Sequence, residues 1–267
     1  MIKGDDLRQD QLITQVIGLI DILLKKEGLE MYLSPYRVLA TSRNEGFIEV
    51  VDGAFNLAYV LEKHNNLIQN FFFEHNRTTK DVADAFERYI RSCGKKKKKK
   101  IIIKFYTINK AAYSVITFVL GIGDRHFDNL LLTKDGKLFH VDFGFILGKD
   151  PKPFPPAIRI NKEMIEGMGG LESEEYKSFL LYAVQVYNVL RKHSNFIINL
   201  FTLMVDGGIG NIESEPECIP KLYQKFRLDL EDERADEFLI TMIEECVSSL
   251  FPEVIERLHT FVQKRKK

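Results

Sequence analysis

Cysteine and long apolar runs are the features that this sequence most clearly lacks. It has only three cysteines, and Cys93, Cys218 and Cys246 have neither the spacing of zinc ligands nor that of a disulfide framework. We expect them to be small buried side chains in a reducing compartment. No apolar run approaches the ~18 residues of a membrane-spanning helix, and the first residues lack a signal-peptide pattern. These absences predict a cytoplasmic protein whose membrane contacts are peripheral.

An overall excess of charge is also absent, although the balance conceals a local concentration. The 267 residues include 38 basic and 38 acidic side chains, but residues 94–110 hold eight lysines and no acidic residue. The remaining sequence has 30 basic against 38 acidic residues, a net charge of −8. That sign is unfavourable for nucleic-acid binding, so no nucleic-acid partner is expected. With 45% hydrophobic residues, the chain can bury one large core or two small ones.

Apolar periodicity predicts a few strands followed by many helices. Residues 36–41 and 46–51 resemble two strands around a Ser-Arg-Asn-Glu turn, whereas residues 52–76 show only short helical or irregular patterns. Helices are expected over residues 7–26, 79–93, 111–120, 173–190, 195–205, 230–250 and 252–267. The run 195–205 is almost entirely apolar, which predicts a buried helix. The apolar stripe and basic end of residues 252–267 suit a helix lying on an anionic membrane.

A polar loop followed by a hairpin is the most informative stretch. Residues 123–129 are Gly-Asp-Arg-His-Phe-Asp-Asn, here called the catalytic loop, and residues 142–144 are Asp-Phe-Gly. Between them, two apolar runs flank the turn Lys134-Asp135-Gly136-Lys137. Asp-Gly between apolar runs is a strong hairpin signal. The hairpin brings the residues before and after it to the same end.

The side chains gathered at that end have the chemistry of a phosphoryl-transfer site. Asn129 supplies an amide oxygen and Asp142 a carboxylate, and these oxygens suit a hard cation such as Mg²⁺ that bridges to phosphate. Asp124 and His126, on the loop before the hairpin, can position a hydroxyl or accept its proton. Which of these two takes the proton is open.

The order of these residues resembles that of the phosphatidylinositol kinases and the large protein kinases related to them. Protein kinases have His-Arg-Asp ahead of their Asn and then Asp-Phe-Gly, whereas here the loop has the reversed order Asp-Arg-His. Residues 145–156, here called the activation loop, are Phe-Ile-Leu-Gly-Lys-Asp-Pro-Lys-Pro-Phe-Pro-Pro. With Asn161-Lys162-Glu163-Met164 and Gly167-Met168-Gly169-Gly170, they resemble the class III phosphatidylinositol 3-kinases. The resemblance covers almost all of the chain outside residues 94–110.

The resemblance implies an α+β, two-lobed, kinase-like fold. Residues 1–51 would form part of the small lobe, a truncated set of β-strands, together with the hinge. Residues 52–267 would form a mostly helical large lobe. Because the glycine-rich or equivalent phosphate-binding loop of the small lobe is missing, we expect these 267 residues alone to bind ATP weakly and to have little activity.

The resemblance also implies roles for the loop residues. Asp124 and His126 would serve the substrate hydroxyl as catalytic residues, and Asn129 and Asp142 would bind Mg²⁺, with Mn²⁺ as an alternative. Arg125 would pair with a nearby carboxylate and hold the loop. His140, on the hairpin, is expected to be structural.

A nucleotide site is implied at the start of the chain and in the hairpin. Lys3 matches a phosphate-binding lysine of the family. In the family one residue separates that lysine from the following glycine, whereas here Lys3 is directly followed by Gly4. The alternative is that Lys3 is simply an exposed lysine. Asp5 and Asp10 would line the back of the pocket; their alternative role is to cap the helix that follows, and both roles can hold at once. The implied adenine contacts are Tyr36 in the inner pocket, Glu49 and Val51 in the hinge, and Leu131 and Val141 in the apolar floor.

The activation loop is expected to select the lipid. A head group with extra phosphates requires several cations, and this loop offers only Lys149 and Lys152. That favours plain phosphatidylinositol. The implied activity is transfer of the γ-phosphoryl group of ATP to its 3-hydroxyl, giving phosphatidylinositol 3-phosphate. By resemblance this reaction would take place peripherally on endosomal and autophagic membranes, during endosomal trafficking and autophagy. Regulatory protein subunits would take part, and the helix 252–267 would lie on the membrane.

Residues 94–110 interrupt the resemblance. Their removal would join Cys93 directly to Ala111, as in the family, and their composition suggests a retained intron. If they are translated, a disordered loop is expected. The alternative is a basic loop that binds anionic lipid.

Two other functions stay open at this stage. One is a phosphatidylinositol 4-kinase or a related protein kinase, against which Lys-Asp-Pro-Lys-Pro in the activation loop argues. The other is a catalytically inert fragment that binds membranes or partner proteins.

Overall fold

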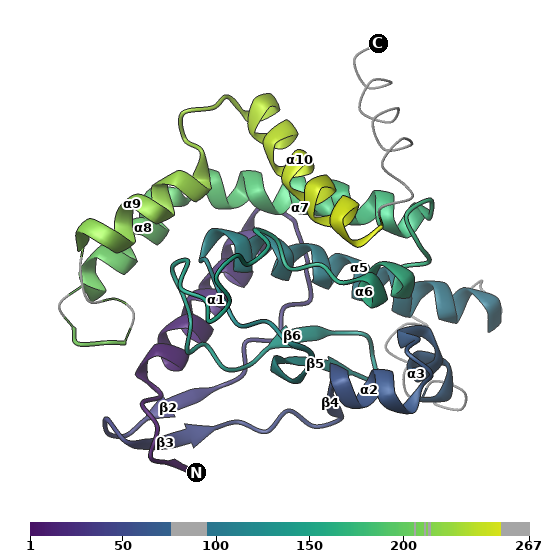
Figure 1. The fold of residues 1–267 in the computed structure, drawn as a ribbon, viewed down its shortest axis with the longest axis horizontal. Helices are drawn as coiled ribbons and strands as arrows, with labels where there is room; N and C mark the ends of the chain where they lie inside the picture. The colour runs from purple at the N-terminus through teal and green to yellow at the C-terminus, as the bar shows by residue number, and fades with distance from the viewer. Residues whose placement is uncertain (76–94, 206, 211, 213–214, 252–267) are drawn as a thin grey trace.

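Two small antiparallel sheets form one side of the molecule, and long helices cover them on the other (Figure 1). The computed structural model describes residues 1–75, 95–205, 207–210, 212 and 215–251. This mixture of many helices and small sheets agrees with the expected α+β class.

The first sheet packs against the first helix. Its strands β1 (Ile2–Lys3), β2 (Val38–Ala40) and β3 (Glu45–Ile48) have the order β1-β3-β2. Helix α1 (Arg8–Lys26) packs on β2 and buries the apolar stripe that predicted it. A Cβ at Gly46 of β3 would lie 2.4 Å from the Leu39 carbonyl oxygen, so this close strand pairing requires glycine. The helix and both strands predicted here are confirmed.

The second sheet contains the predicted hairpin. Strands β5 (Leu130–Thr133) and β6 (Leu138–His140) pair in the register Leu130 opposite His140. Strand β4 (Ala54–Asn56) adds to the other edge of β5, giving the order β4-β5-β6. The sequence did not predict β4, because three residues are too short to show alternation and this strand depends on a partner strand 75 to 79 residues later.

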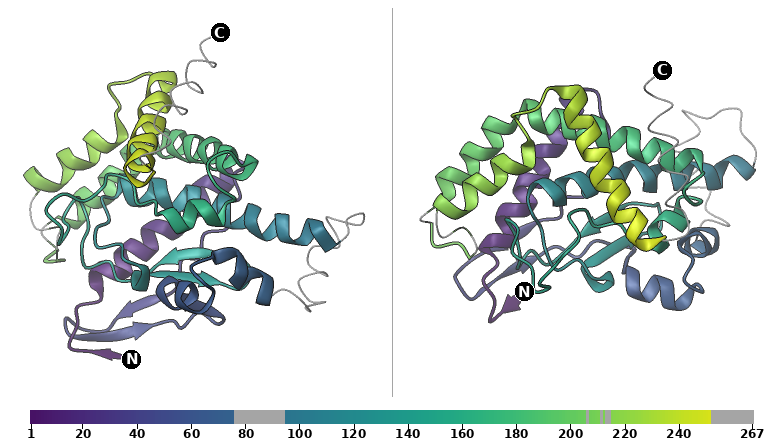
Figure 2. Two further views of the ribbon diagram at one scale, coloured as in Figure 1. Left: turned by 45° about the vertical axis from the view of Figure 1, so that its right-hand side comes forward. Right: turned by 45° about the horizontal axis from the view of Figure 1, so that its top comes forward.

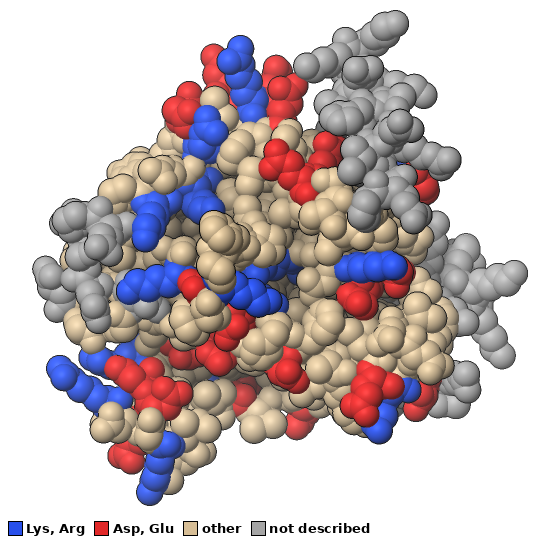
Figure 3. Space-filling model, in the orientation of Figure 1, with Lys and Arg blue, Asp and Glu red and all other residues tan. Residues whose placement is uncertain are grey.

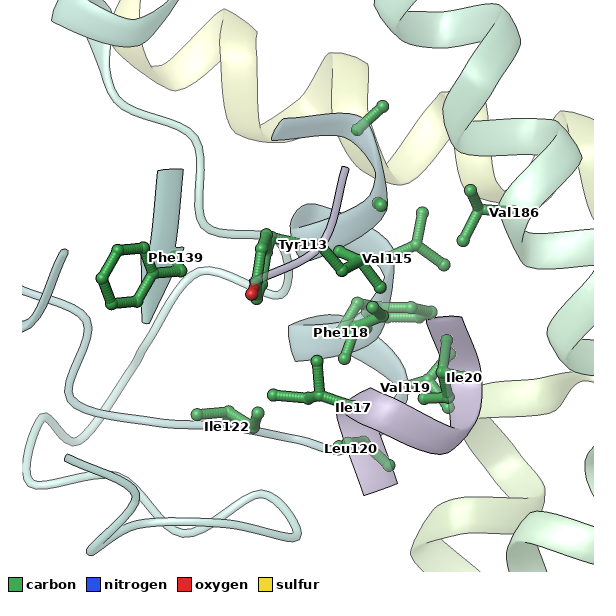
Figure 4. Close-up of a cluster of buried hydrophobic side chains, with 14 of the residues drawn as sticks. Ile17, Ile20, Tyr113, Val115, Phe118, Val119, Leu120, Ile122, Phe139 and Val186 are labelled. Atoms are coloured by element: carbon green, nitrogen blue, oxygen red, sulfur yellow. The ribbon is translucent and has the colours of Figure 1, made fainter. Parts of the chain in front are cut away.

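Helices make up most of the remaining structure. They are α2 (Leu57–Lys63), α3 (Ile68–His75), α5 (Lys95–Val119), α6 (Lys162–Gly167), α7 (Glu174–Lys192), α8 (Ser194–Met204), α9 (Glu215–Phe226) and α10 (Asp232–Leu250). Helix α5 is central: it packs on α7, α3, α9 and β6. Its side chains Val115, Phe118 and Val119 meet Ile17 and Ile20 of α1 and Val186 of α7 in one buried cluster (Figure 4). Figure 2 shows α10 crossing over α7.

The predicted helices are confirmed where the structure describes them, with one correction of environment. Ser173 begins α7 as predicted, because its hydroxyl accepts a hydrogen bond from the Tyr176 amide at 3.0 Å. Helix α8 was expected to be buried, but Phe196 is 53% exposed and Leu203 80% exposed, since only one side of α8 faces the core. Helices α6 and α9 were not predicted. Helices 79–93 and 252–267 lie outside the described residues. In the part of the chain that is described, none of the helices has the length and apolarity of a bilayer-crossing segment.

The disordered loop expected over residues 94–110 is wrong from Lys95 onward, since α5 begins there and continues without a break to Val119. Asn109 explains how its middle part is anchored. Its Nδ2 donates to the Tyr32 carbonyl at 2.8 Å, and its Oδ1 accepts from the Leu138 amide at 2.8 Å. These bonds connect α5 to β6 and to the loop after α1. Lysine is also a good helix former, so nothing in the lysine run opposes the helix.

Lys110 is an unfavourable residue at the next position. Its side chain is fully buried, and its Nζ donates to the Arg159 carbonyl oxygen at 2.9 Å. It makes no ion pair with any carboxylate in the described part of the chain. Burial lowers the pKa of Lys110 to about 7. The folded protein therefore carries a desolvated amine that water would otherwise keep fully charged.

Replacing Lys110 with methionine should stabilise the fold. Between pH 7 and the ordinary lysine pKa, the unfolded chain binds more protons at this position than the folded chain. The free energy of unfolding of the parent should then rise with pH from about 7 to 9, by up to about 1.4 kcal/mol per pH unit. Denaturant titrations should show higher stability and no such rise for Lys110→Met. The exposed Lys104 on the same helix provides the control Lys104→Met, whose stability should follow the parent curve. An unchanged pH slope in Lys110→Met would contradict this.

Deleting residues 94–110 should also stabilise the chain. The deletion leaves Cys93 immediately before Ala111, where Lys110 now stands, and Tyr89 five residues before Ala111, where the buried Tyr106 stands. A neutral thiol replaces the amine while an aromatic ring is retained, so the thermal midpoint should rise. A midpoint below that of the full 267-residue chain would show that residues 94–110 contribute more to the core than their replacements could.

Candidate active site

The end of the β5–β6 hairpin brings the two predicted metal-binding residues together. Past the last strand pair, the Val141 amide donates to the Asn129 carbonyl at 3.1 Å, so the pairing extends to the residues beside Asp142. The Asn129 side chain is buried, and its Nδ2 donates to the Asp124 carbonyl at 3.0 Å. Asp142 is exposed and accepts from the Gly144 amide at 3.1 Å. An oriented amide and an exposed carboxylate at one end of a hairpin can provide oxygen ligands for a divalent cation.

Arg125 fastens the catalytic loop to the hairpin. Its buried guanidinium donates from Nε to the Gly123 carbonyl at 2.5 Å and from one terminal nitrogen to the Val141 carbonyl at 2.8 Å. The other terminal nitrogen donates to the Asp142 carbonyl. The expected carboxylate partner is therefore wrong, because Arg125 holds the loop through three backbone carbonyls. Burial lowers the pKa of Arg125 to about 10, so the group is still charged at neutral pH.

His126 lies between two carboxylates. Its Nε2 is 3.8 Å from Asp124 Oδ2, and its Nδ1 is 3.6 Å from Asp128 Oδ2. The Asp128 amide donates to Nδ1 at 3.3 Å, which assigns the ring proton of the neutral imidazole to Nε2, on the side of Asp124. Asp124 and His126 are thus adjacent, as expected, and both are partly exposed. In this tautomer Asp124 can accept a proton from a hydroxyl placed between them, whereas His126 Nε2 donates to that hydroxyl; acceptance by His126 there requires the other tautomer, with the ring proton on Nδ1.

Side chains at the start of α1 bond both backbone polar groups of Phe143. The Phe143 amide donates to Asp10 Oδ1 at 2.9 Å, and the Gln9 side chain donates from Nε2 to the Phe143 carbonyl at 2.5 Å. Two consecutive residues therefore hold both polar groups of one residue next to Asp142. Burial raises the pKa of Asp10 to about 6, and the negative charges of Asp142 and Asp5 act in the same direction.

Neither Asp5 nor Asp10 caps α1 with its side chain. The N-cap is Leu7, and the carboxylate that accepts from the first helical amide belongs to Asp6, at 3.1 Å from the Arg8 nitrogen. Asp10 lies in the first turn, where its charge suits the helix dipole, but its side chain is directed to Phe143. The capping alternative is therefore wrong for both residues as a hydrogen-bonded cap.

The predicted adenine contacts lie along the connection between the two sheets and on the hairpin beside it. Glu49 and Val51 fall between β3 and β4; Glu49 pairs with the Arg37 backbone through its amide, at 2.9 Å, and through its carboxylate, at 2.8 Å. Tyr36 is buried with its ring centroid 5.9 Å from that of Phe139 on β6. Leu131 and Val141 are half-buried on the same hairpin.

Lys3 stands apart from these residues. It is exposed on β1, opposite Glu45 of β3. Among the described residues, no hydrogen bond or ion pair connects it to the catalytic loop or the hairpin. Its assignment to phosphate stays a prediction.

Lys149 and Lys152 are both exposed on the activation loop, as their predicted contact with substrate requires. Phe154, at the outer part of the same loop, is 93% exposed. In the view of Figure 3, basic and acidic side chains lie next to one another over the middle of the molecule, so this face has no broad basic area.

Three residues of the site were missed by sequence reasoning. Asp128 flanks His126, Gln9 holds the Phe143 carbonyl, and Asp150 accepts a hydrogen bond from the Asp124 amide at 3.0 Å. The loop sequence offered a signal for Asp128, which is the second carboxylate within five residues and stands two residues after His126. Gln9 and Asp150 act on backbone groups that are distant in the sequence, and no local pattern indicates such contacts.

Comparison with known proteins identifies similar chains. The family model described as "Phosphatidylinositol 3- and 4-kinase" matches residues 1–214. A soybean (Glycine max) protein named "Phosphatidylinositol 3-kinase, root isoform" is 49% identical over 265 residues, covering 98% of this chain and 30% of the relative. "Phosphatidylinositol 3-kinase VPS34" of Arabidopsis thaliana is 48% identical over 265 residues, with the same coverage, and that of Saccharomyces cerevisiae is 39% identical over 264 residues, 97% and 28%. The chain thus spans less than a third of the length of these curated relatives.

His140 generates a prediction about acid stability. It is fully buried on β6 and stacks on Tyr113 of α5, with ring centroids 5.1 Å apart. Neither ring nitrogen has a hydrogen-bond partner among the described residues. Burial lowers the pKa of His140 well below 6.5, and the positive charges of Arg125 and Lys110 act in the same direction. His140 is therefore neutral in the folded state.

Stability should fall as the pH is lowered through the ordinary histidine pKa. Below pH 6.5 the unfolded chain protonates His140 while the folded chain does not, so the free energy of unfolding should drop by up to about 1.4 kcal/mol per pH unit from this residue. His140→Phe keeps the stacked ring and removes the titrating group. Denaturant titrations from about pH 7 to 5 should show a smaller drop for the variant than for the parent. Parallel curves would contradict the assignment.

Proposed function

The chain belongs to the phosphatidylinositol 3- and 4-kinase family, and we propose that, within a complete enzyme, it transfers the γ-phosphoryl group of ATP to the 3-hydroxyl of phosphatidylinositol. The observation that carries this proposal is the hairpin end, where Asn129 and Asp142 lie beside the Asp124–His126 pair. The relatives with the highest identity quoted above are named phosphatidylinositol 3-kinases, which supports the 3-position. The product would be phosphatidylinositol 3-phosphate.

The fold divides into two lobes in this proposal. Residues 1–51 form part of the small lobe with the hinge, and residues 52–267 form the large lobe. Support comes from the connection between β3 and β4, which joins the two sheets and carries Glu49 and Val51. Adenine would lie between this connection and the half-buried Leu131 and Val141 of the hairpin.

The phosphates of ATP would extend from there toward the hairpin end. Asn129 and Asp142 are the residues proposed to hold Mg²⁺, or Mn²⁺ in its place. The donor set fits, because it consists of one amide oxygen and one carboxylate, and the Nδ2 bond to Asp124 fixes which way the amide faces. A bound cation of this kind offsets the negative charge on the phosphates during transfer. Lys3, Asp5 and Asp10 would line the phosphate side of the same pocket.

The transfer needs one proton acceptor and an acceptor hydroxyl in line with the phosphate. The inositol oxygen forms a bond to the γ-phosphorus while the bond from that phosphorus to the β-phosphate oxygen breaks. The proton of the hydroxyl passes to Asp124, or to His126 Nε2 when the imidazole is in its other tautomer; these two facing groups are 3.8 Å apart. Lys149 and Lys152 would contact the single phosphate of the lipid head group as point charges.

The setting of this activity follows the substrate. Phosphatidylinositol is a membrane lipid, so the enzyme would work peripherally on membranes, and we place it on endosomal and autophagic membranes with regulatory protein subunits. The helix predicted for residues 252–267, outside the described residues, would lie on the same surface.

A substrate panel with a full-length protein containing this chain tests the proposal. Vesicles of phosphatidylinositol, of its 4-phosphate and of its 4,5-bisphosphate, together with a peptide substrate, would be offered with ATP and Mg²⁺. We expect phosphatidylinositol to be phosphorylated fastest and only at the 3-position. A 4-phosphate product, or preference for the peptide, would assign the alternative kinase classes. No transfer to any acceptor would favour the inert binding fragment.

Replacing Asp142 with alanine in the same protein should reduce phosphorylation by at least about 100-fold, the scale of loss when one preorganised electrostatic contact to a transition state is removed. The thermal midpoint should fall only slightly: Asp142 is exposed, and the cost is confined to alanine at a φ of +60° and to the lost bond from the Gly144 amide. Asp135, in the turn at the opposite end of the same hairpin, gives the matched control Asp135→Ala, which should keep its turnover. Undiminished turnover in Asp142→Ala would overturn the proposed metal role.

A further inference from the structure

The base of the activation loop is hydrogen-bonded to the chain that leads into the catalytic loop. The Leu147 amide donates to the Leu120 carbonyl, the Gly148 amide to the Gly121 carbonyl and the Gly123 amide to the Phe145 carbonyl, each at 2.9 Å. The two backbones approach so closely that Gly121 and Gly123 leave no room for a side chain. A Cβ at Gly121 would lie 2.4 Å from the Gly148 nitrogen, and one at Gly123 would lie 2.3 Å from the Lys149 carbonyl oxygen. The two segments are therefore closely packed and joined through their backbones.

Asp150 continues this connection with a side chain. Its carboxylate is only 4% exposed, and its Oδ2 accepts from the Asp124 amide at 3.0 Å. Asp124 has a φ of +49°, a left-handed conformation that costs a non-glycine residue free energy. The bond from Asp150 thus supports the backbone of Asp124 in a conformation that costs free energy.

The same carboxylate also organises the part of the activation loop that carries the lysines. Its Oδ1 accepts from the Lys152 amide at 2.9 Å, and its Oδ2 accepts from the Arg159 guanidinium. The Asp150–Arg159 ion pair closes residues 150–159 into a loop with exposed Lys152 and Phe154 between its ends. One buried carboxylate therefore touches the catalytic loop on one side and the lysine-bearing loop on the other.

We propose that Asp150 is a positioning residue that aligns Asp124 with the activation loop. The substrate hydroxyl, held by the activation loop, would then meet the proton acceptor on the catalytic loop. This inference rests on the proposed phosphoryl-transfer function and adds a residue to it. Asp150 does not touch the reacting atoms in this arrangement; it acts through the Asp124 amide. A misplacement of about 1 Å at such a position can cost about 100-fold in rate.

Amide hydrogen exchange tests the geometric part without reference to any substrate. In a full-length protein containing this chain, the Asp124 amide should exchange slowly, faster in Asp150→Ala, and at an intermediate rate in Asp150→Asn, whose amide oxygen can still accept. Asp229, which accepts from Arg227 at 2.9 and 2.8 Å in the loop between α9 and α10, supplies the matched control Asp229→Asn. This control should leave the Asp124 amide unchanged. Equal protection in parent and Asp150→Ala would overturn the proposal.

Steady-state kinetics test the functional part with whichever acceptor the parent phosphorylates. For Asp150→Ala, kcat should fall about 10- to 100-fold with the KM for ATP unchanged, the range seen when a supporting contact of a site residue is lost. Asp150→Asn should recover part of that loss, and Asp229→Asn should match the parent. In an Asp124→Asn background, Asp150→Ala should cost little further, because its effect passes through Asp124.

The outcomes separate this inference from the proposed function. If the parent phosphorylates a different acceptor but Asp150→Ala still lowers kcat as described, the proposed substrate is wrong and the positioning role stands. A loss of rate that follows only a lower thermal midpoint, or that adds fully to the Asp124→Asn loss, would overturn the positioning role while leaving the proposed function in place.

Discussion

A buried guanidinium is the interaction on which the arrangement of the site depends. Arg125 donates to backbone carbonyls of Gly123, Val141 and Asp142, so one side chain joins the catalytic loop to the two residues after the hairpin. These acceptors are main-chain atoms, and their positions follow from the path of the chain and not from side-chain identity. A planar group with five fixed donors can satisfy carbonyls in three directions at once, which lysine cannot. Burial lowers the pKa of Arg125, and the negative charges of Asp142 and Asp124 offset part of that effect without a direct ion pair.

Strain accompanies this arrangement at the positions that carry the chemistry. Asp124 and Asp142 both have positive φ, at +49° and +60°, as does Leu147 at +56° in the activation loop. Each such residue costs free energy and persists only when its surroundings hold it. The surroundings here are specific: Asp150 bonds the Asp124 amide, and Gln9 and Asp10 bond both polar groups of the residue after Asp142. The activation loop therefore supports the strained backbone at Asp124, and the first turn of α1 supports the strained backbone at Asp142.

The parts that the sequence could predict are those decided by neighbouring residues. The Asp-Gly turn and its flanking apolar runs specify the hairpin, and the hairpin alone brings Asn129 beside Asp142. Contacts between distant segments leave no such signal. The bond from Gln9 to Phe143 spans 134 positions, and β4 is a strand only because β5 accepts it. The prediction of a carboxylate partner for Arg125 was wrong for the same reason. A sequence shows which residues are charged, but it does not show where backbone carbonyls point.

Helix α5 provides a physical criterion for whether residues 94–110 suit this fold. The position two residues before Ala111 must both donate and accept, as Asn109 does toward the Tyr32 carbonyl and the Leu138 amide. The next position is fully buried and is better filled by a neutral group than by Lys110. Without residues 94–110 these positions would carry Ser92 and Cys93. A serine hydroxyl has one donor and can accept, and a buried cysteine behaves as a small hydrophobe. The shorter chain therefore meets the second requirement, which the longer chain does not, and offers a hydroxyl as donor and acceptor for the first.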